Sequence, residues 1–135
     1  MRNKISSIKL TENFKKEILY NSLCNGLGQL QCYGLEILYS DSDYTEGKKS
    51  YYERTKKLSG ACYEDILMEI LALDKKIVFE DTETGEFFNL KLSEALNNLD
   101  NLPVWVVSQL LDESDDSTTA DVVLQFALFN EVIFG

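Results

Sequence analysis

The sequence predicts an α+β fold: a helix-rich single domain over residues 1–135, with one β-hairpin at about residues 76–92 and a central, apolar C-terminal helix. Three segments carry this prediction. Residues 61–73 place apolar side chains at helical spacing, residues 75–92 hold two β-rich runs around a short turn, and residues 119–135 are the most apolar part of the chain. A chain of 135 residues suits one domain and can bury a core without metals or disulfides.

The first predicted helix begins after Thr11, whose hydroxyl can cap it, and ends at Asn25, because Gly26 is a common helix stop. Its apolar residues recur every three or four positions: Phe14, Ile18, Leu19 and Leu23. In residues 35–39, Leu35, Ile37 and Tyr39 alternate with Glu36 and Leu38, which is compatible with a short strand.

The next segment, residues 41–49, is polar, and we expect a loop there, followed by a short surface helix over residues 50–58. The helix over residues 61–73 has the clearest pattern in the chain. Its apolar stripe consists of Ile66, Leu67, Ile70, Leu71 and Leu73.

Two β-rich runs follow, joined by residues 82–85, where Gly85 supplies the positive φ that a tight hairpin turn needs. A short helix is expected after Ser93, and Pro103 stands at the beginning of another helix. An acidic stretch, residues 112–119, leads into the last helix.

That last helix is expected to run through Ile133, with Thr118 or Thr119 as its N-cap. Apolar residues cover almost its whole circumference, which is typical of a helix at the centre of a domain. The alternative is a contact between subunits, because Phe129 and Phe134 would form an adhesive patch if both were exposed.

The residues of this last segment also resemble the closing pattern of small proteins from tailed phages and prophages, A-D-x-x-x-Q-x-A-L-F-G-E-I/V-V/I-Y/F-G. The matching positions are Ala120, Asp121, Gln125, Ala127, Leu128, Phe129, Glu131 and Gly135, and Asn130 departs from the pattern. Residues 61–71 and the hairpin after them look similar as well. The resemblance implies a phage or mobile-element origin. It brings no activity, so no functional residue follows from it.

The residue types argue against an enzyme. The chain has no histidine, which removes the commonest general base and metal ligand. The glycine-rich residues 24–34 lack the third glycine of a dinucleotide-binding motif. Residues 41–52 begin like a calcium loop, but Tyr52 stands where a bidentate glutamate is required. We therefore expect no cofactor and no metal, and three reduced, partly buried thiols: Cys24, Cys32 and Cys62.

Charge is the best functional clue in the sequence. Residues 1–58 carry 10 basic and 7 acidic side chains, whereas residues 59–135 carry 3 basic and 16 acidic ones. An excess of carboxylates attracts basic partners, so we expect a protein-interaction module that engages a basic site, for instance on a nucleic-acid-binding host protein. The residues expected to form the acidic surface are Asp112, Glu113, Asp115 and Asp116, with Glu80, Asp81, Glu83 and Glu86 on the hairpin.

Other interpretations remain open at this stage. The chain could be a small assembly protein that forms homo-oligomers through its apolar C-terminal helix. Basic side chains have tyrosines beside them over residues 44–58, a pattern typical of single-strand binding. The sequence pI near 4.4 argues against direct nucleic-acid binding. No apolar run has the length of a membrane span or signal peptide, so we expect a cytoplasmic protein.

Overall fold

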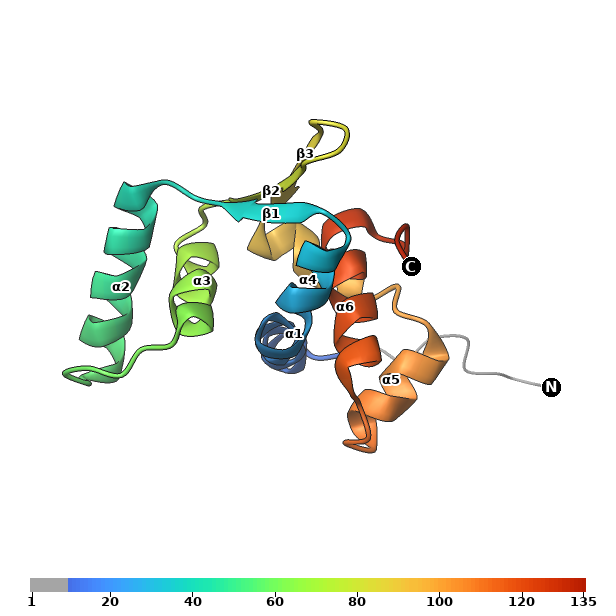
Figure 1. The fold of residues 1–135 in the computed structure, drawn as a ribbon. Helices are drawn as coiled ribbons and strands as arrows, with labels where there is room; N and C mark the ends of the chain where they lie inside the picture. The colour runs from blue at the N-terminus through green and yellow to red at the C-terminus, as the bar shows by residue number, and fades with distance from the viewer. Residues whose placement is uncertain (1–9) are drawn as a thin grey trace. The chain divides into compact units, whose positions relative to one another are not determined.

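The computed structural model describes residues 10–135, which form two compact units (Figure 1). Unit 1 combines the chain up to Leu27 with Ala95–Gly135, and unit 2 is Gly28–Glu94. The described residues form six α-helices and one three-stranded antiparallel sheet, which confirms the predicted helix-rich α+β class. The single-domain organisation stays a prediction.

Helix α1 (Glu12–Cys32) is longer than predicted. The backbone N–H of Phe14 donates to the Thr11 hydroxyl at 3.1 Å, which confirms the N-cap. The helix does not stop at Gly26, because this glycine serves close packing and not termination. A Cβ there would lie 2.9 Å from Leu124 Cδ1 and 3.1 Å from the Ala120 carbonyl oxygen, both in α6 (Ser117–Phe129).

Helix α6 forms the centre of unit 1, as predicted for the C-terminal helix. In Figure 1 it lies beside α1, and unit 1 also contains α5 (Val104–Leu111) and most of α4 (Leu92–Leu99). Seven residues of α6 are buried: Thr119, Ala120, Val122, Val123, Leu124, Gln125 and Ala127.

The helix ends four residues earlier than predicted, because Asn130 adopts the left-handed conformation (φ 61°) after Phe129. The following segment is held by Gln125, whose side chain is fully buried. Its Oε1 accepts from the backbone N–H groups of Ile133 at 2.8 Å and Phe134 at 2.9 Å. Its Nε2 donates to Asp121 Oδ1 at 3.0 Å and to the Phe134 carbonyl at 3.3 Å. A single amide therefore fixes residues 133–134 against the helix.

In unit 2, helix α2 (Asp41–Thr55) packs against α3 (Tyr63–Ala72). The loop expected over residues 41–49 is wrong, because these residues are the first turns of α2. Ser40 caps the helix by accepting from the Asp43 N–H at 3.0 Å. Gly47 is interior to it, since a Cβ there would lie 2.9 Å from Ile70 Cγ1 of α3.

A buried carboxylate also joins these two helices. Glu69 of α3 is 5% exposed and pairs with Arg54 of α2, whose Nε lies 2.7 Å from Oε1. The Ser50 hydroxyl donates to the other carboxylate oxygen at 2.8 Å. The buried charge is therefore compensated on both oxygens.

The sheet of unit 2 has the order β1 (Leu35–Leu38), β2 (Ile77–Asp81), β3 (Phe87–Leu90). Strands β2 and β3 confirm the predicted hairpin, and Gly85 has the expected positive φ of 78°. The inner face of the sheet presents Leu35, Ile37, Ile77, Phe79, Phe88 and Leu90; the outer face presents Glu36, Leu38, Val78, Glu80, Phe87 and Asn89.

The two helical glycines of α1 predict opposite responses to alanine. Gly26→Ala should lower the free energy of unfolding by roughly 1–3 kcal/mol, because the new methyl group overpacks the α1–α6 contact. A Cβ at Gly28 would have no atom within 4 Å, so Gly28→Ala should raise the free energy of unfolding by about 0.4–1 kcal/mol through its higher helix propensity. Urea unfolding followed by far-UV circular dichroism measures both. Equal effects of the two substitutions would contradict the close packing at Gly26.

Replacing the Gln125 amide should release the segment after α6. Gln125→Leu keeps the volume but leaves the N–H groups of Ile133 and Phe134 without acceptors. Hydrogen exchange read by NMR should then show much faster exchange at these two amides, while the amides of α1 change little. Unchanged protection at both positions would show that other contacts hold the segment.

Candidate interaction surfaces

The charge imbalance between the two sequence halves is not found between the two units, because each unit contains residues from both halves. The sequence of unit 1 carries 5 basic and 9 acidic side chains, and that of unit 2 carries 8 basic and 14 acidic ones. Both units are therefore moderately negative, with net charges of −4 and −6. An acidic surface must be sought locally, among carboxylates that have no cation beside them.

The turn between α5 and α6 provides such carboxylates. Asp112, Glu113 and Asp115 are all exposed and form no ion pair with a described residue. Glu113 adopts the left-handed conformation, with φ 56°. We define these three residues as the acidic turn.

Asp116, the fourth residue predicted for this surface, instead has a structural role. It is the N-cap of α6 and accepts from the Thr119 backbone N–H at 3.1 Å. That hydrogen bond lowers the pKa of the Asp116 carboxyl below its usual value. The predicted caps, Thr118 and Thr119, were wrong, because both lie inside the first turn of α6, and Thr119 is its third residue. It is fully buried, and its hydroxyl donates to Gln109 of α5.

Beside the acidic turn lies a cleft of about 420 Å³ within unit 1. Three carboxylates line it: Glu113 and Asp115 from the turn, and Glu17 from α1. The sequence did not predict Glu17, because only the fold brings it close to residues nearly 100 positions away in the chain. Glu17 also forms no ion pair with a described residue. The remaining lining residues are Phe14, Ile18, Asn21, Leu110 and Leu111.

The hairpin residues predicted for the acidic surface do not form one group. Asp81 is 8% exposed, and its Oδ1 accepts from the N–H groups of Glu83 at 2.9 Å and Thr84 at 3.4 Å. Its inclusion in an exposed surface was wrong, because the carboxylate stabilises the turn of the hairpin. Glu83 and Glu86 are exposed at the turn, and Glu80 is half-buried on the outer face of the sheet.

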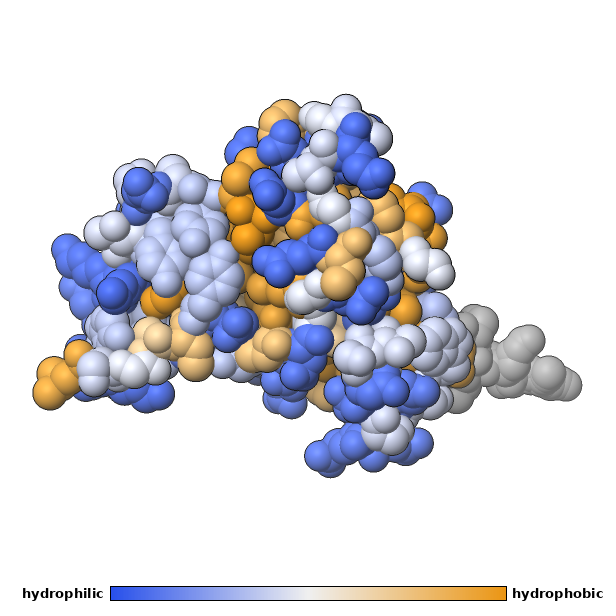
Figure 2. Space-filling model, in the orientation of Figure 1, coloured by the Kyte–Doolittle hydropathy of each residue, from blue (hydrophilic) through white to orange (hydrophobic). Residues whose placement is uncertain are grey.

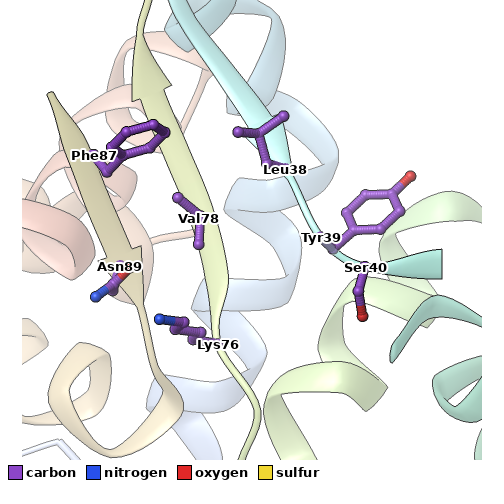
Figure 3. A pocket seen from close by; sticks show the side chains of 7 residues that line it. All are labelled: Leu38, Tyr39, Ser40, Lys76, Val78, Phe87 and Asn89. Atoms are coloured by element: carbon purple, nitrogen blue, oxygen red, sulfur yellow. The ribbon is translucent and has the colours of Figure 1, made fainter. Parts of the chain in front are cut away.

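The outer face of the sheet also carries a shallow hollow of about 530 Å³ (Figure 3). Leu38, Val78 and Phe87, one from each strand, point to the same side, with Asn89 and Lys76 farther along the strands. Tyr39 and Ser40 complete the lining. Figure 2 shows apolar residues exposed among hydrophilic ones in the region of the strands.

Part of the basic, tyrosine-rich stretch is engaged in contacts within unit 2, whereas Lys48, Lys49 and Lys56 are exposed. Tyr51 is buried, and the charged groups of Arg54 and Lys57 each lie 5.7 Å from the centre of its ring. Arg54 is also paired with Glu69. These aromatic and cationic groups therefore interact with one another within unit 2.

The described residues contain no group of three potential metal ligands, and no helix among them is long and apolar enough to cross a membrane. Cys24, Cys32 and Cys62 form no disulfide, but all three are exposed. The expectation that these thiols are partly buried was wrong, because they lie on solvent-facing positions of α1 and at the N-cap of α3.

Comparison with known proteins adds no further assignment. No protein-family model, no curated protein and no solved structure matches the chain.

The pKa of Asp116 predicts a specific dependence of stability on pH. A carboxyl with a lowered folded pKa contributes stability that is fully present above its unfolded pKa, and this contribution is lost as the pH falls through the folded pKa. Asp116→Ala should therefore destabilise the protein at neutral pH and progressively less in acid. Asp115→Ala, which removes an exposed carboxylate without a cap, should have little effect at either pH. Chemical unfolding at several pH values tests both, and a pH-independent loss in Asp116→Ala would contradict the capping role.

Proposed function

We propose that this chain is a non-enzymatic protein-interaction module of phage or mobile-element origin, acting in the cytoplasm. It engages a basic site on a partner protein through the acidic turn and the adjoining cleft of unit 1. A nucleic-acid-binding host protein is a natural target, because its groove already accommodates negative charge. The observation that carries the proposal is the group of carboxylates, Glu17, Glu113 and Asp115, around one cleft with no described cation to neutralise them.

The composition of the cleft suits the side chain of lysine or arginine. Such a side chain has an aliphatic stem and a charged end, and it binds most favourably where apolar and acidic groups are adjacent. Here Phe14, Ile18 and Leu110 supply apolar walls, and the carboxylates lie at the same cleft. Charge-assisted hydrogen bonds to the carboxylates would orient the bound cation.

Exposed apolar residues also occur on α5, the helix that leads into the acidic turn. Trp105 is 49% exposed, Val104 57% and Leu111 53%, and Leu111 also lines the cleft. Exposed tryptophan is one of the residue types that dominate binding energy at interfaces. The surface therefore combines apolar area for affinity with charge for specificity.

The alternative function, self-association through the C-terminal helix, has less support. The apolar residues of α6 are already used within unit 1, where most of the helix is buried. Phe129 and Phe134 pack on each other with ring centres 5.9 Å apart, and both are half-buried. Little apolar surface on the helix itself is left for a second subunit, and the exposed apolar residues of this region, Val132 and Ile133, lie after its end.

The test is selection of binding peptides from a random display library, followed by affinity measurement of the selected peptides. The proposal predicts enrichment of lysine and arginine, and affinity that falls as salt is added. Glu113→Gln/Asp115→Asn should weaken binding about fivefold, the loss expected for two partly exposed charge pairs. Glu83→Gln/Glu86→Gln removes the same charge from the hairpin turn and should leave the affinity unchanged.

Two results would contradict the proposal. Peptides without basic residues would exclude recognition by the carboxylates. Equal weakening by the two double substitutions would show that net charge, and not the cleft, attracts the peptide.

A further inference from the structure

We propose that the free edge of β3 in unit 2 binds an extended segment of a partner protein, in which an apolar residue precedes a basic residue by two positions. This site is separate from the acidic turn and does not depend on it. Three observations carry the proposal: the unpaired backbone groups of β3, the exposed apolar hollow on the outer face, and two opposed carboxylates on that face.

The alternation of hydrogen-bonded and non-hydrogen-bonded residue pairs along the β2–β3 ladder shows which backbone groups of β3 are unpaired. The Asp81 N–H donates to the Glu86 carbonyl at 2.8 Å, so the hydrogen-bonded pairs of the β2–β3 ladder continue at 79/88 and 77/90. The N–H and C=O groups of Phe87 and Asn89 therefore point away from β2. No other described strand pairs with β3, so these four groups are available to an added strand.

The opposite edge of the sheet is less suitable. At β1 the Thr82 N–H donates to the Gly34 carbonyl at 2.9 Å, so the outward groups belong to Leu35 and Ile37. Their side chains lie on the inner face, and residues paired with them would turn their side chains toward that face. At β3, the side chains of Phe87 and Asn89 lie on the outer face. A peptide paired with them places its own side chains over the hollow.

The hollow requires an apolar side chain. Phe87 is 61% exposed and Leu38 38% exposed, and both line the hollow with Val78. A peptide residue opposite Asn89 is separated from Val78 by Asn89 itself, because the register places Val78 on the other side of Asn89, so only a long side chain can extend across Asn89 to the hollow. A large apolar side chain at this position would cover the exposed apolar surface.

The charge on the same face requires a basic side chain and disfavours a second copy of this chain. Glu36 of β1 and Glu80 of β2 are directly opposite each other, an arrangement that destabilises a sheet, and neither pairs with a described cation. Glu80 is in turn opposite Phe87. A lysine or arginine paired with Phe87 can lie over its ring and reach toward Glu80. Two copies stacked face to face would bring four carboxylates together, and two copies paired antiparallel along β3 would place Asn89, which carries no charge, opposite Phe87.

The antiparallel direction determines the order of the two residues. A strand antiparallel to β3 meets Asn89 before Phe87, so its apolar residue comes first and its basic residue second. The segment recognised is therefore apolar–x–basic, read from N- to C-terminus.

The test is an NMR titration with the capped pentapeptide Thr-Phe-Thr-Arg-Thr. The amide signals of Phe87 and Asn89 should shift as new hydrogen bonds form, with a Kd on the order of a millimolar or tighter. Two control probes have matched composition: the reversed peptide Thr-Arg-Thr-Phe-Thr, and the original peptide N-methylated at its phenylalanine and arginine. Both should bind at least about fivefold more weakly, since the first misplaces the side chains and the second removes two donors.

Variants of the protein separate this site from the acidic turn. Phe87→Thr and Glu80→Gln should each lower the affinity for the peptide about threefold or more, as expected for the loss of one partly exposed contact. Glu113→Gln/Asp115→Asn should leave its affinity unchanged. The proposal is overturned by shifts at Leu35 and Ile37, by equal binding of the control peptides, by the absence of shifts at millimolar peptide, or by self-association of the protein through Phe87 in sedimentation.

Discussion

Unit 1 depends on the burial of α6 with two polar side chains inside it. Burying an amide or hydroxyl is costly unless its hydrogen bonds are replaced, and α6 replaces them at both of its ends. Gln125 uses both atoms of its amide to hold residues 133–134 and to bind Asp121. Thr119 uses its hydroxyl and backbone N–H to join Gln109 and Asp116. These hydrogen bonds allow an apolar helix to lie at the centre of unit 1, and they also fix its orientation there.

The proposed function follows from the Thr119 end of this helix. The bonds among Thr119, Asp116 and Gln109 connect α5 to α6 and so determine the course of the turn between them. That turn presents Glu113 and Asp115 beside Glu17, and none of the three forms an ion pair with a described residue. A carboxylate that the protein itself does not neutralise is free to attract a basic ligand, and a preorganised turn reduces the entropy lost on binding. Asp116 supports this surface through its hydrogen bond to Thr119.

Local patterns predicted the fold class well. The helix over residues 61–73, the hairpin with Gly85 and the central C-terminal helix were all confirmed because their signals lie within short stretches of sequence. The errors came from tertiary contacts. Gly26 and Gly47 look like helix breakers, yet both occupy helix interiors where another helix approaches closely. At both positions the close packing of a second helix outweighs the low helix propensity of glycine.

The candidate surfaces were predicted only in part, for the same reason. A run of acidic residues is visible in sequence, so the exposed residues of the acidic turn were found. Whether a given carboxylate is free depends on its neighbours in space. Asp81 stabilises its own hairpin turn and Glu17 joins a cleft formed largely by distant residues, and neither fact is encoded in local spacing.

Hydrogen exchange of the protein with and without a selected basic peptide tests the central claim most directly, because it locates the binding surface. The account predicts added protection at residues 17–21 of α1 and at residues 110–116 around the acidic turn, lost as salt is raised. Protection confined to the hairpin turn at residues 82–86, or no local protection at saturating peptide, would contradict it.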